Sequence, residues 1–124
     1  MAQAREVIEQ QSVDSRKKKE LRVLTLTAHA VRVLRGVRIV SCKSAKDRTS
    51  MSVTAEQVAV LERWHHLDPG SAPALLDNFR RSGVRMYNTL QNVGKSGYAF
   101  NAFQRLLLPR MLRAAANTTV KAQS

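Results

Sequence analysis

Apolar side chains recur every three or four positions along much of this chain, the spacing that places them on one face of an α-helix. The segment 21–35 follows this spacing, and Gly36 stands where a glycine commonly ends a helix. Its letters LTLTAHAVRV also alternate between apolar and polar residues, so a strand is a second interpretation of this segment. On the helical interpretation the apolar positions are Leu21, Leu24, Ala28 and Val31.

The same spacing predicts helices on both sides of a chain break at 68–70 (DPG). One covers 48–66, and the next runs from Ser71 to Gly83, with Pro73 near its start. The stretch that follows is polar, with glycines at 94 and 97, and a last helix is predicted over Tyr98–Leu108. The apolar faces consist of Met51, Ala55, Val58 and Leu61 in the first helix, and of Leu75, Leu76 and Phe79 in the second.

One segment is predicted to be a buried strand. Val37–Val40 (VRIV) is short, β-branched and bounded by Gly36 and the cysteine at position 42. A single strand has no ladder partner, and buried backbone polar groups must be paired. We therefore expect an α/β domain that is mostly helical in this chain and whose sheet is incomplete here.

Composition narrows the possible classes of protein. The 124 residues include 21 Lys and Arg against 9 Asp and Glu, a net charge of +12, and a single cysteine. Such a charge attracts phosphorylated small molecules, anionic membranes or nucleic acid. One cysteine forms no internal disulfide and no zinc site by itself, and no segment approaches 18 consecutive apolar residues. A soluble cytoplasmic protein is expected.

The cysteine lies in SCKSAKDRTS, residues 41–50, between the predicted strand and a predicted helix. The backbone N–H groups of such a loop can cradle an anion, and the positive end of the helix adds to the attraction. Cys42 beside Lys43 and Lys46 should therefore have a lowered pKa and be a thiolate, the species that attacks phosphorus. Arg48 can bind the phosphoryl oxygens, and Thr49 can donate its hydroxyl to the sulfur. The competing interpretation is a buried structural cysteine at the start of a basic helix.

The letters CKSAKDRT (42–49) resemble the active-site loop of the inositol polyphosphate 4-phosphatases, within the superfamily of cysteine-dependent phosphatases. The resemblance continues through TSMSVTAEQV (49–58) and returns in RRSGVRMYNTLQNVGKSGYAFNAFQ (80–104). It implies a lipid phosphatase that needs no metal or cofactor. Such an enzyme would remove the 4-phosphate of phosphatidylinositol 3,4-bisphosphate through a phosphocysteine intermediate.

The resemblance also implies roles for the loop residues. Cys42 would be the nucleophile and Arg48 the phosphate clamp. Asp47 would be the general acid that protonates the leaving inositol oxygen. The alternative for Asp47 is a helix cap or an ion pair with a nearby Arg or Lys. The substrate would be bound by Lys43, Ser44, Ala45 and Lys46. Their backbone would form the cradle, and the two lysines would add their ammonium groups.

On this basis residues 21–113 are expected to be a partial phosphatase domain. A charged segment, 1–20, would precede it, and a flexible tail, 114–124, would follow. The expected partners are a phosphoinositide and the anionic membrane that holds it, with the protein peripheral to that membrane. The alternative is a catalytically incomplete basic module that binds phosphoinositide or anionic membrane without turnover, with nucleic acid as its less favoured ligand. Nucleic acid is not expected as a partner, since no zinc-finger spacing or RNA-recognition signature is present.

Overall fold

The computed structural model describes residues 22–100 and 102–120. The predicted charged segment 1–20 therefore lies outside the described residues. The chain divides into two units between Ile39 and Val40. The predicted helix of 21–35 belongs to the first unit.

The first unit contains α2, Arg22–Val33, which confirms the helical interpretation of this segment. The helix does not end at a left-handed Gly36. Arg35 takes the left-handed conformation, with φ of 54°, and donates its N–H to the carbonyl of Arg32. Gly36 follows and donates to Val31 at 2.8 Å, so the two bonds close the helix end in a Schellman motif.

The strand predicted at Val37–Val40 is wrong for this chain. The segment is without regular structure, and the side chains of Val37 and Ile39 are 91% and 93% exposed. A β-branched segment needs a neighbouring strand to pair its N–H and C=O groups, and no strand exists among the described residues. The described part of the chain is helical, so the expected strand–loop–helix is present only as loop and helix.

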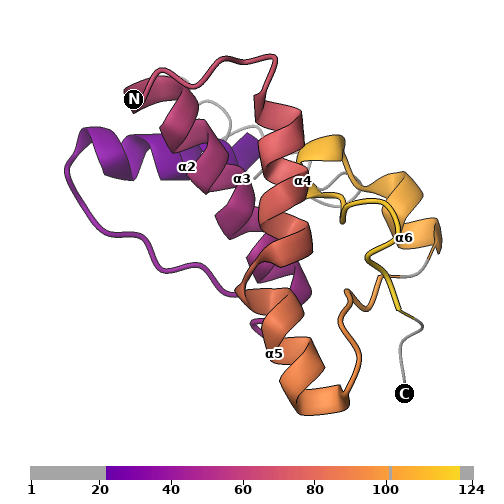
Figure 1. Cartoon of the computed structure of the whole chain (residues 1–124). Coiled ribbons are helices and arrows are strands. Elements are labelled where there is room, and N and C mark those ends of the chain that lie inside the picture. Colours follow the sequence, from indigo (N-terminus) through magenta and orange to yellow (C-terminus); the bar gives the residue numbers. More distant parts are fainter. Residues whose placement is uncertain (1–21, 101, 121–124) are drawn as a thin grey trace. The chain divides into compact units, whose positions relative to one another are not determined.

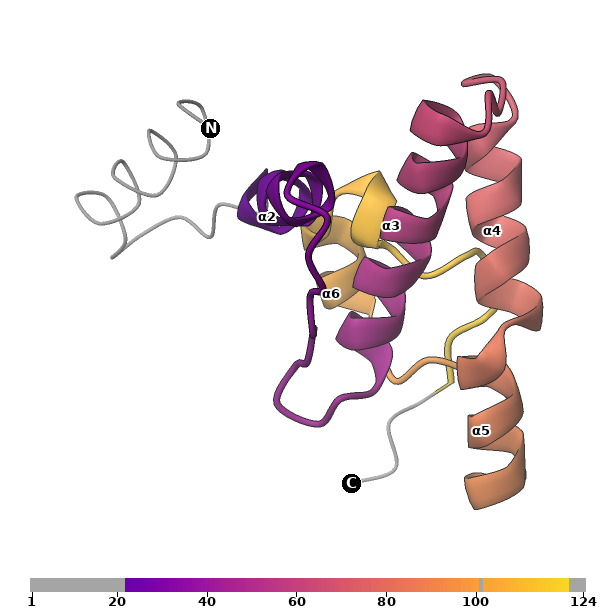
Figure 2. The same cartoon turned by 90° about the vertical axis from the view of Figure 1, so that its left-hand side faces the viewer.

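The second unit is helical in its described part, and α3 is its longest helix (Figure 1). α3 spans Asp47–Trp64 and packs against α4, Ala72–Ser82, as the helical spacing predicted. α5, Val84–Val93, continues from α4 in roughly the same direction, as Figures 1 and 2 both show. The predicted helix of Tyr98–Leu108 is confirmed only in its second half, as α6, Ala102–Leu107. A 3₁₀ turn, η1, Arg110–Leu112, then returns to α3.

A single residue, Gly83, ends α4 and begins α5. A Cβ atom at this position would lie 2.2 Å from the carbonyl oxygen of Phe79, closer than real Cβ contacts allow. Only glycine therefore lets the two helices meet without moving the backbone. Gly83 fixes the direction in which α5 leaves α4.

Arg80 lies at the centre of the second unit, with 1% of its surface exposed. Its Nε donates to the hydroxyl of Thr54 at 3.1 Å, and one terminal nitrogen donates to the carbonyl of Arg113 at 2.6 Å. The other terminal nitrogen donates to the carbonyls of Met51, at 3.2 Å, and Met111. Burial lowers the pKa of this guanidinium, but arginine keeps its charge at neutral pH. A buried cation thus ties α3 and α4 to the segment around η1.

Tyr98 is completely buried and connects the same parts of the unit. Its hydroxyl donates to the carbonyl of Arg80 at 2.8 Å, and burial raises the pKa of the phenol. The backbone of Tyr98 accepts from Val120 at 3.0 Å and donates to Thr118 at 2.8 Å, next to an isolated parallel bridge with Thr119.

These bonds hold the end of the described chain in place. Ala114, Ala115 and Thr118 are buried, so this part of the chain packs against the unit. Residues 121–124 lie outside the described part. None of the helices within 22–100 and 102–120 is long and apolar enough to cross a membrane.

Candidate functional site

The residues before α3 form a tight loop that begins at the cysteine. The N–H of Ala45 donates to the carbonyl of Cys42 at 2.9 Å, and Ala45 has a φ of 48°, in the left-handed region. Alanine rarely takes this conformation, which reverses the chain so that it enters α3 at Asp47. The reversal turns backbone N–H groups of the loop toward its own first residue.

The Cys42 thiol is surrounded by hydrogen-bond donors. The hydroxyl of Thr49 lies beside it and accepts the N–H of Cys42 at 2.9 Å. A hydrogen bond from this hydroxyl to the sulfur is the largest cause that lowers the pKa of Cys42, to about 6. Burial opposes this shift, and the backbone N–H groups of Lys46, Ser44 and Thr49 add to it. Cys42 is partly exposed, so at neutral pH it is an accessible thiolate.

Alkylation of Cys42 tests this arrangement, because the chain has no other cysteine. The rate of modification by iodoacetamide should rise with pH around a midpoint of about 6 and be constant above it. Thr49→Val keeps the shape of the side chain but removes the hydroxyl, so the midpoint should move upward. Thr49→Ser keeps the hydroxyl and is the matched control. A parent midpoint above pH 8 would contradict the hydrogen-bonded thiolate.

Asp47, the first residue of α3, anchors the loop to distant parts of the unit. Its Oδ1 accepts from Nε of Arg85, in α5, at 2.5 Å. Its Oδ2 accepts the backbone N–H of Ala99 at 2.8 Å. Both carboxylate oxygens are thus engaged, and the carboxylate itself is 13% exposed. The structure contains the ion pair that the sequence left open as the alternative to a general acid.

The other predicted loop residues are more exposed. Lys43, Ser44, Ala45 and Lys46 all lie at the surface, and so does Arg48 in the first turn of α3. Arg48 makes no hydrogen bond or ion pair within the described part of the chain. The structure therefore brings Thr49 to Cys42, whereas Arg48 has no contact that fixes its guanidinium.

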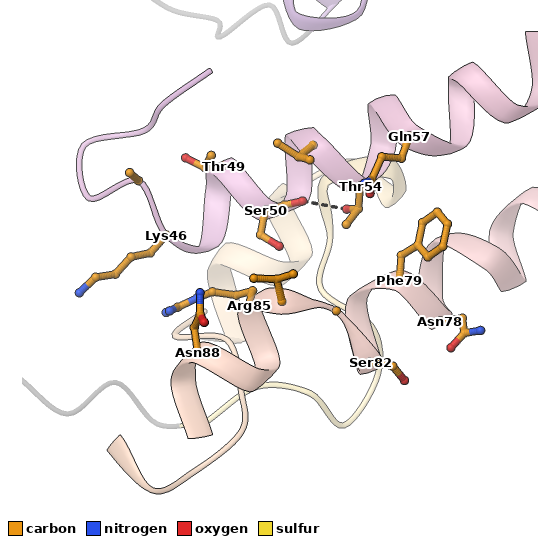
Figure 3. A pocket seen from close by; sticks show the side chains of 14 residues that line it. Lys46, Thr49, Ser50, Thr54, Gln57, Asn78, Phe79, Ser82, Arg85 and Asn88 are labelled. Carbon is orange, nitrogen blue, oxygen red and sulfur yellow. Dashed lines mark hydrogen bonds between the residues drawn. The ribbon is translucent and has the colours of Figure 1, made fainter. Parts of the chain in front are cut away.

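A pocket of about 550 Å³ lies beside the loop, between α3 and the junction of α4 and α5. Figure 3 shows Lys46 and Thr49 from the loop side, with Arg85 and Asn88 from α5 across from them. Phe79 lies farther along the pocket. Cys42 does not line this pocket, so the space adjoins the cysteine loop without containing the thiol.

Sequence reasoning did not single out Arg80, which organises the unit, or assign a contact to Arg85. The spacing could have indicated the first, because Arg80 lies four residues after Leu76 and eight after Ala72, on one face of α4. No local pattern indicates the pairing of Arg85 with Asp47, since 38 residues separate them. That contact exists only in the folded chain.

Residues 4–112 match the family described as the INPP4A C-terminal domain. The chain is 41% identical over 114 residues to inositol polyphosphate 4-phosphatase type II of Homo sapiens, covering 92% of this chain and 12% of the relative. It is 40% identical over the same length to type II inositol 3,4-bisphosphate 4-phosphatase of Rattus norvegicus, again covering 92% of this chain and 12% of the relative. The chain therefore spans 12% of the length of these curated relatives.

The chain also resembles a different kind of protein over a shorter stretch. Over 72 residues the chain is 33% identical to the phosphatidylinositol 3,4,5-trisphosphate-dependent Rac exchanger 2 protein of Homo sapiens, covering 58% of this chain and 4% of the relative. No solved structure matches the chain.

Proposed function

This chain belongs to the family of the INPP4A C-terminal domain, and we propose that it supplies the nucleophile loop of a phosphoinositide phosphatase. The proposed reaction removes the 4-phosphate of phosphatidylinositol 3,4-bisphosphate and leaves the 3-phosphate. The names of the relatives, which are 4-phosphatases of inositol phosphates, support this substrate class. The activity of the whole protein is part of the proposal, because the chain spans 12% of those relatives.

The observation that carries the proposal is the thiolate of Cys42 within a ring of N–H and O–H donors. In the proposed first step the sulfur forms a bond to phosphorus, and the bond from phosphorus to the inositol oxygen breaks. In the second step water attacks phosphorus, and the sulfur leaves as a thiolate that Thr49 stabilises. Donors that hold a thiolate at neutral pH serve both steps, because the sulfur is nucleophile in one and leaving group in the other.

Arg48 is the proposed phosphate clamp. Its guanidinium is exposed and uncommitted within the described residues, so it is free to turn onto phosphoryl oxygens when a substrate arrives. Lys43 and Lys46, also exposed, carry the positive charge that a second phosphate requires. With Ser44 and Ala45 they form the proposed substrate-binding part of the loop. The same charges favour an anionic membrane surface as the place of reaction.

Asp47 is the proposed general acid by resemblance, and its contacts favour a different role. Both carboxylate oxygens of Asp47 accept hydrogen bonds, from Arg85 and from the Ala99 N–H, so neither oxygen is available to a substrate in this arrangement. Proton donation by Asp47 would first require these two bonds to break. We therefore propose that Asp47 anchors the loop in this arrangement. It could serve as the proton donor of the reaction only after both bonds have broken.

Phosphate release from short-chain phosphatidylinositol 3,4-bisphosphate tests the proposal directly. Release should continue in EDTA, because the thiolate and not a metal activates the attack. Treatment with iodoacetamide at pH 7 should stop it, because Cys42 is the only thiol. Phosphatidylinositol 3-phosphate should accumulate, and phosphatidylinositol 4-phosphate should not.

The second candidate function is phosphoinositide binding without turnover. The absence of a strand from the described residues favours it, because the expected sheet would support the loop from behind. Binding of the lipid without any release of phosphate, before and after alkylation, would assign this function to the chain.

A further inference from the structure

The pocket beside the loop has the charge pattern of a site for an anion. Its lining includes two cationic side chains, Lys46 and Arg85, and no carboxylate. Asp47 binds Nε of Arg85 and leaves the two terminal nitrogens of that guanidinium available to other acceptors. A planar guanidinium with two adjacent N–H groups matches the oxygens of a phosphate group.

The pocket also carries polar groups that make no hydrogen bond to any part of the chain that the structure describes. The side-chain amides of Gln57 and Asn88 make no hydrogen bond within the described residues, and neither does the ammonium group of Lys46. Each amide can donate and accept, as a hydroxyl group does. Phe79 and Val53 supply an apolar wall against which C–H groups can pack.

This combination selects a chemical class of ligand. The cationic side chains can bind phosphate, and the amides can hydrogen-bond to hydroxyl groups. The apolar wall can pack against the carbon face of a ring. A ring that bears both hydroxyl and phosphate groups meets all three requirements. The volume of about 550 Å³ lies within the range of small-molecule sites, about 300–1,000 Å³.

The pocket and the cysteine loop are parts of one arrangement. Ala45, Lys46 and Thr49 line the pocket and also belong to the loop or to the turn of α3 that follows it. Figure 3 shows the long side chain of Lys46 extending on the side where Arg85 and Asn88 lie. A ligand held by α5 in the pocket would therefore have its other end at the loop.

We propose that this pocket binds the headgroup ring of the phosphoinositide, with Lys46 and Arg85 on a phosphate that is not cleaved and Asn88 on a ring hydroxyl. The inference rests on the proposed function, since it assigns the second phosphate of the same substrate. It adds α5 to the site, so that the uncleaved phosphate is bound by a residue of α5 as well as by a residue of the loop.

Binding to the Cys42→Ser chain tests the proposal without turnover. The probes are inositol 3,4-bisphosphate, short-chain phosphatidylinositol 3,4-bisphosphate, inorganic phosphate and unphosphorylated inositol. Each is titrated by isothermal calorimetry, which gives Kd for every variant, and the Asn88 side-chain amide is followed by NMR in parallel. The two bisphosphates should shift that signal with similar Kd values. Phosphate and inositol alone should bind much more weakly, because each meets only part of the pocket.

Asn88→Ala should weaken binding of inositol 3,4-bisphosphate about fivefold to tenfold, the usual loss for one hydrogen bond. Asn88→Asp should weaken it further, because a carboxylate repels phosphate. Asn92→Ala is the matched control: it removes an exposed asparagine from the next turn of α5, outside the pocket, and should leave Kd unchanged.

Three results would overturn the proposal. The first is an unchanged Kd in Asn88→Ala, and the second is inorganic phosphate that binds as tightly as the bisphosphate. The third is binding of the short-chain lipid but not of inositol 3,4-bisphosphate, which would assign the affinity to the acyl chains. The outcome is separate from that of the proposed function. If hydrolysis occurs but does not depend on Asn88, the proposed function stands and the pocket proposal fails. If binding depends on Asn88 but no hydrolysis occurs, the pocket proposal stands and the proposed function fails.

Discussion

Replacing Cys42 by serine is expected to abolish release of phosphate from phosphatidylinositol 3,4-bisphosphate, by about 10⁴-fold or more. A serine hydroxyl keeps its proton at neutral pH, whereas the donors around Cys42 lower the pKa of the thiol to about 6. The variant therefore loses the nucleophile and keeps the loop. Its affinity for the lipid should remain close to that of the parent chain, because the cationic groups that attract phosphate are unchanged.

Parallel assays of phosphate release and lipid binding separate these two effects. Ser41→Ala is the matched control, because Ser41 is the exposed neighbour of Cys42 and its hydroxyl donates to the Cys42 carbonyl. That variant should release phosphate at the parent rate. Undiminished release by Cys42→Ser would exclude the thiolate mechanism, and loss of lipid binding in that variant would show that the serine had disturbed the loop.

The second large effect is on stability, at Arg80. Arg80→Ala should lower the free energy of unfolding by roughly 3 kcal/mol or more, enough to leave a marginally stable chain largely unfolded. The substitution removes the donors that bind the carbonyls of Met51, Met111 and Arg113 and leaves an empty space beside them. Since Arg80 also positions α4 against α3, the pocket should be lost with it.

Urea unfolding followed by circular dichroism measures this change. Arg81→Ala is the control, since Arg81 is the exposed neighbour of Arg80 in the same helix and its loss should change stability by less than about 0.5 kcal/mol. Arg80→Lys keeps the charge but cannot reach four acceptors from one plane, so it should recover only part of the lost stability. Equal midpoints for Arg80→Ala and the parent would contradict the central role of this cation.

The sequence predicted the helices whose apolar faces are buried. Met51 and Val58 are buried side chains of α3, on the face that the helical spacing predicted. The same reasoning missed α5, because its apolar side chains at Val84, Tyr87 and Val93 remain exposed and the segment looks polar. It also assigned Val37–Val40 to a buried strand from residue type alone. β-branched residues favour a strand only where a neighbouring strand can pair with them.

The candidate site divides in the same way. Cys42 and Thr49 are seven residues apart, so the sequence could predict that the Thr49 hydroxyl lies beside Cys42 once a loop and a helix were recognised. The role of Asp47 depended on Arg85 and on the backbone of Ala99, which the fold alone brings to it. Local chemistry was predictable from the letters, and the tertiary contacts that hold it were not.

The separation of these contacts along the chain sets the order in which the site can assemble. The Cys42–Thr49 bond spans seven residues and closes with the first turns of α3, whereas the Asp47–Ala99 bond spans 52 residues. Contacts of long sequence separation carry a larger loop-closure entropy and form late in folding. The bond between Cys42 and Thr49 can therefore form early, before the long-range bonds fix where the helix starts.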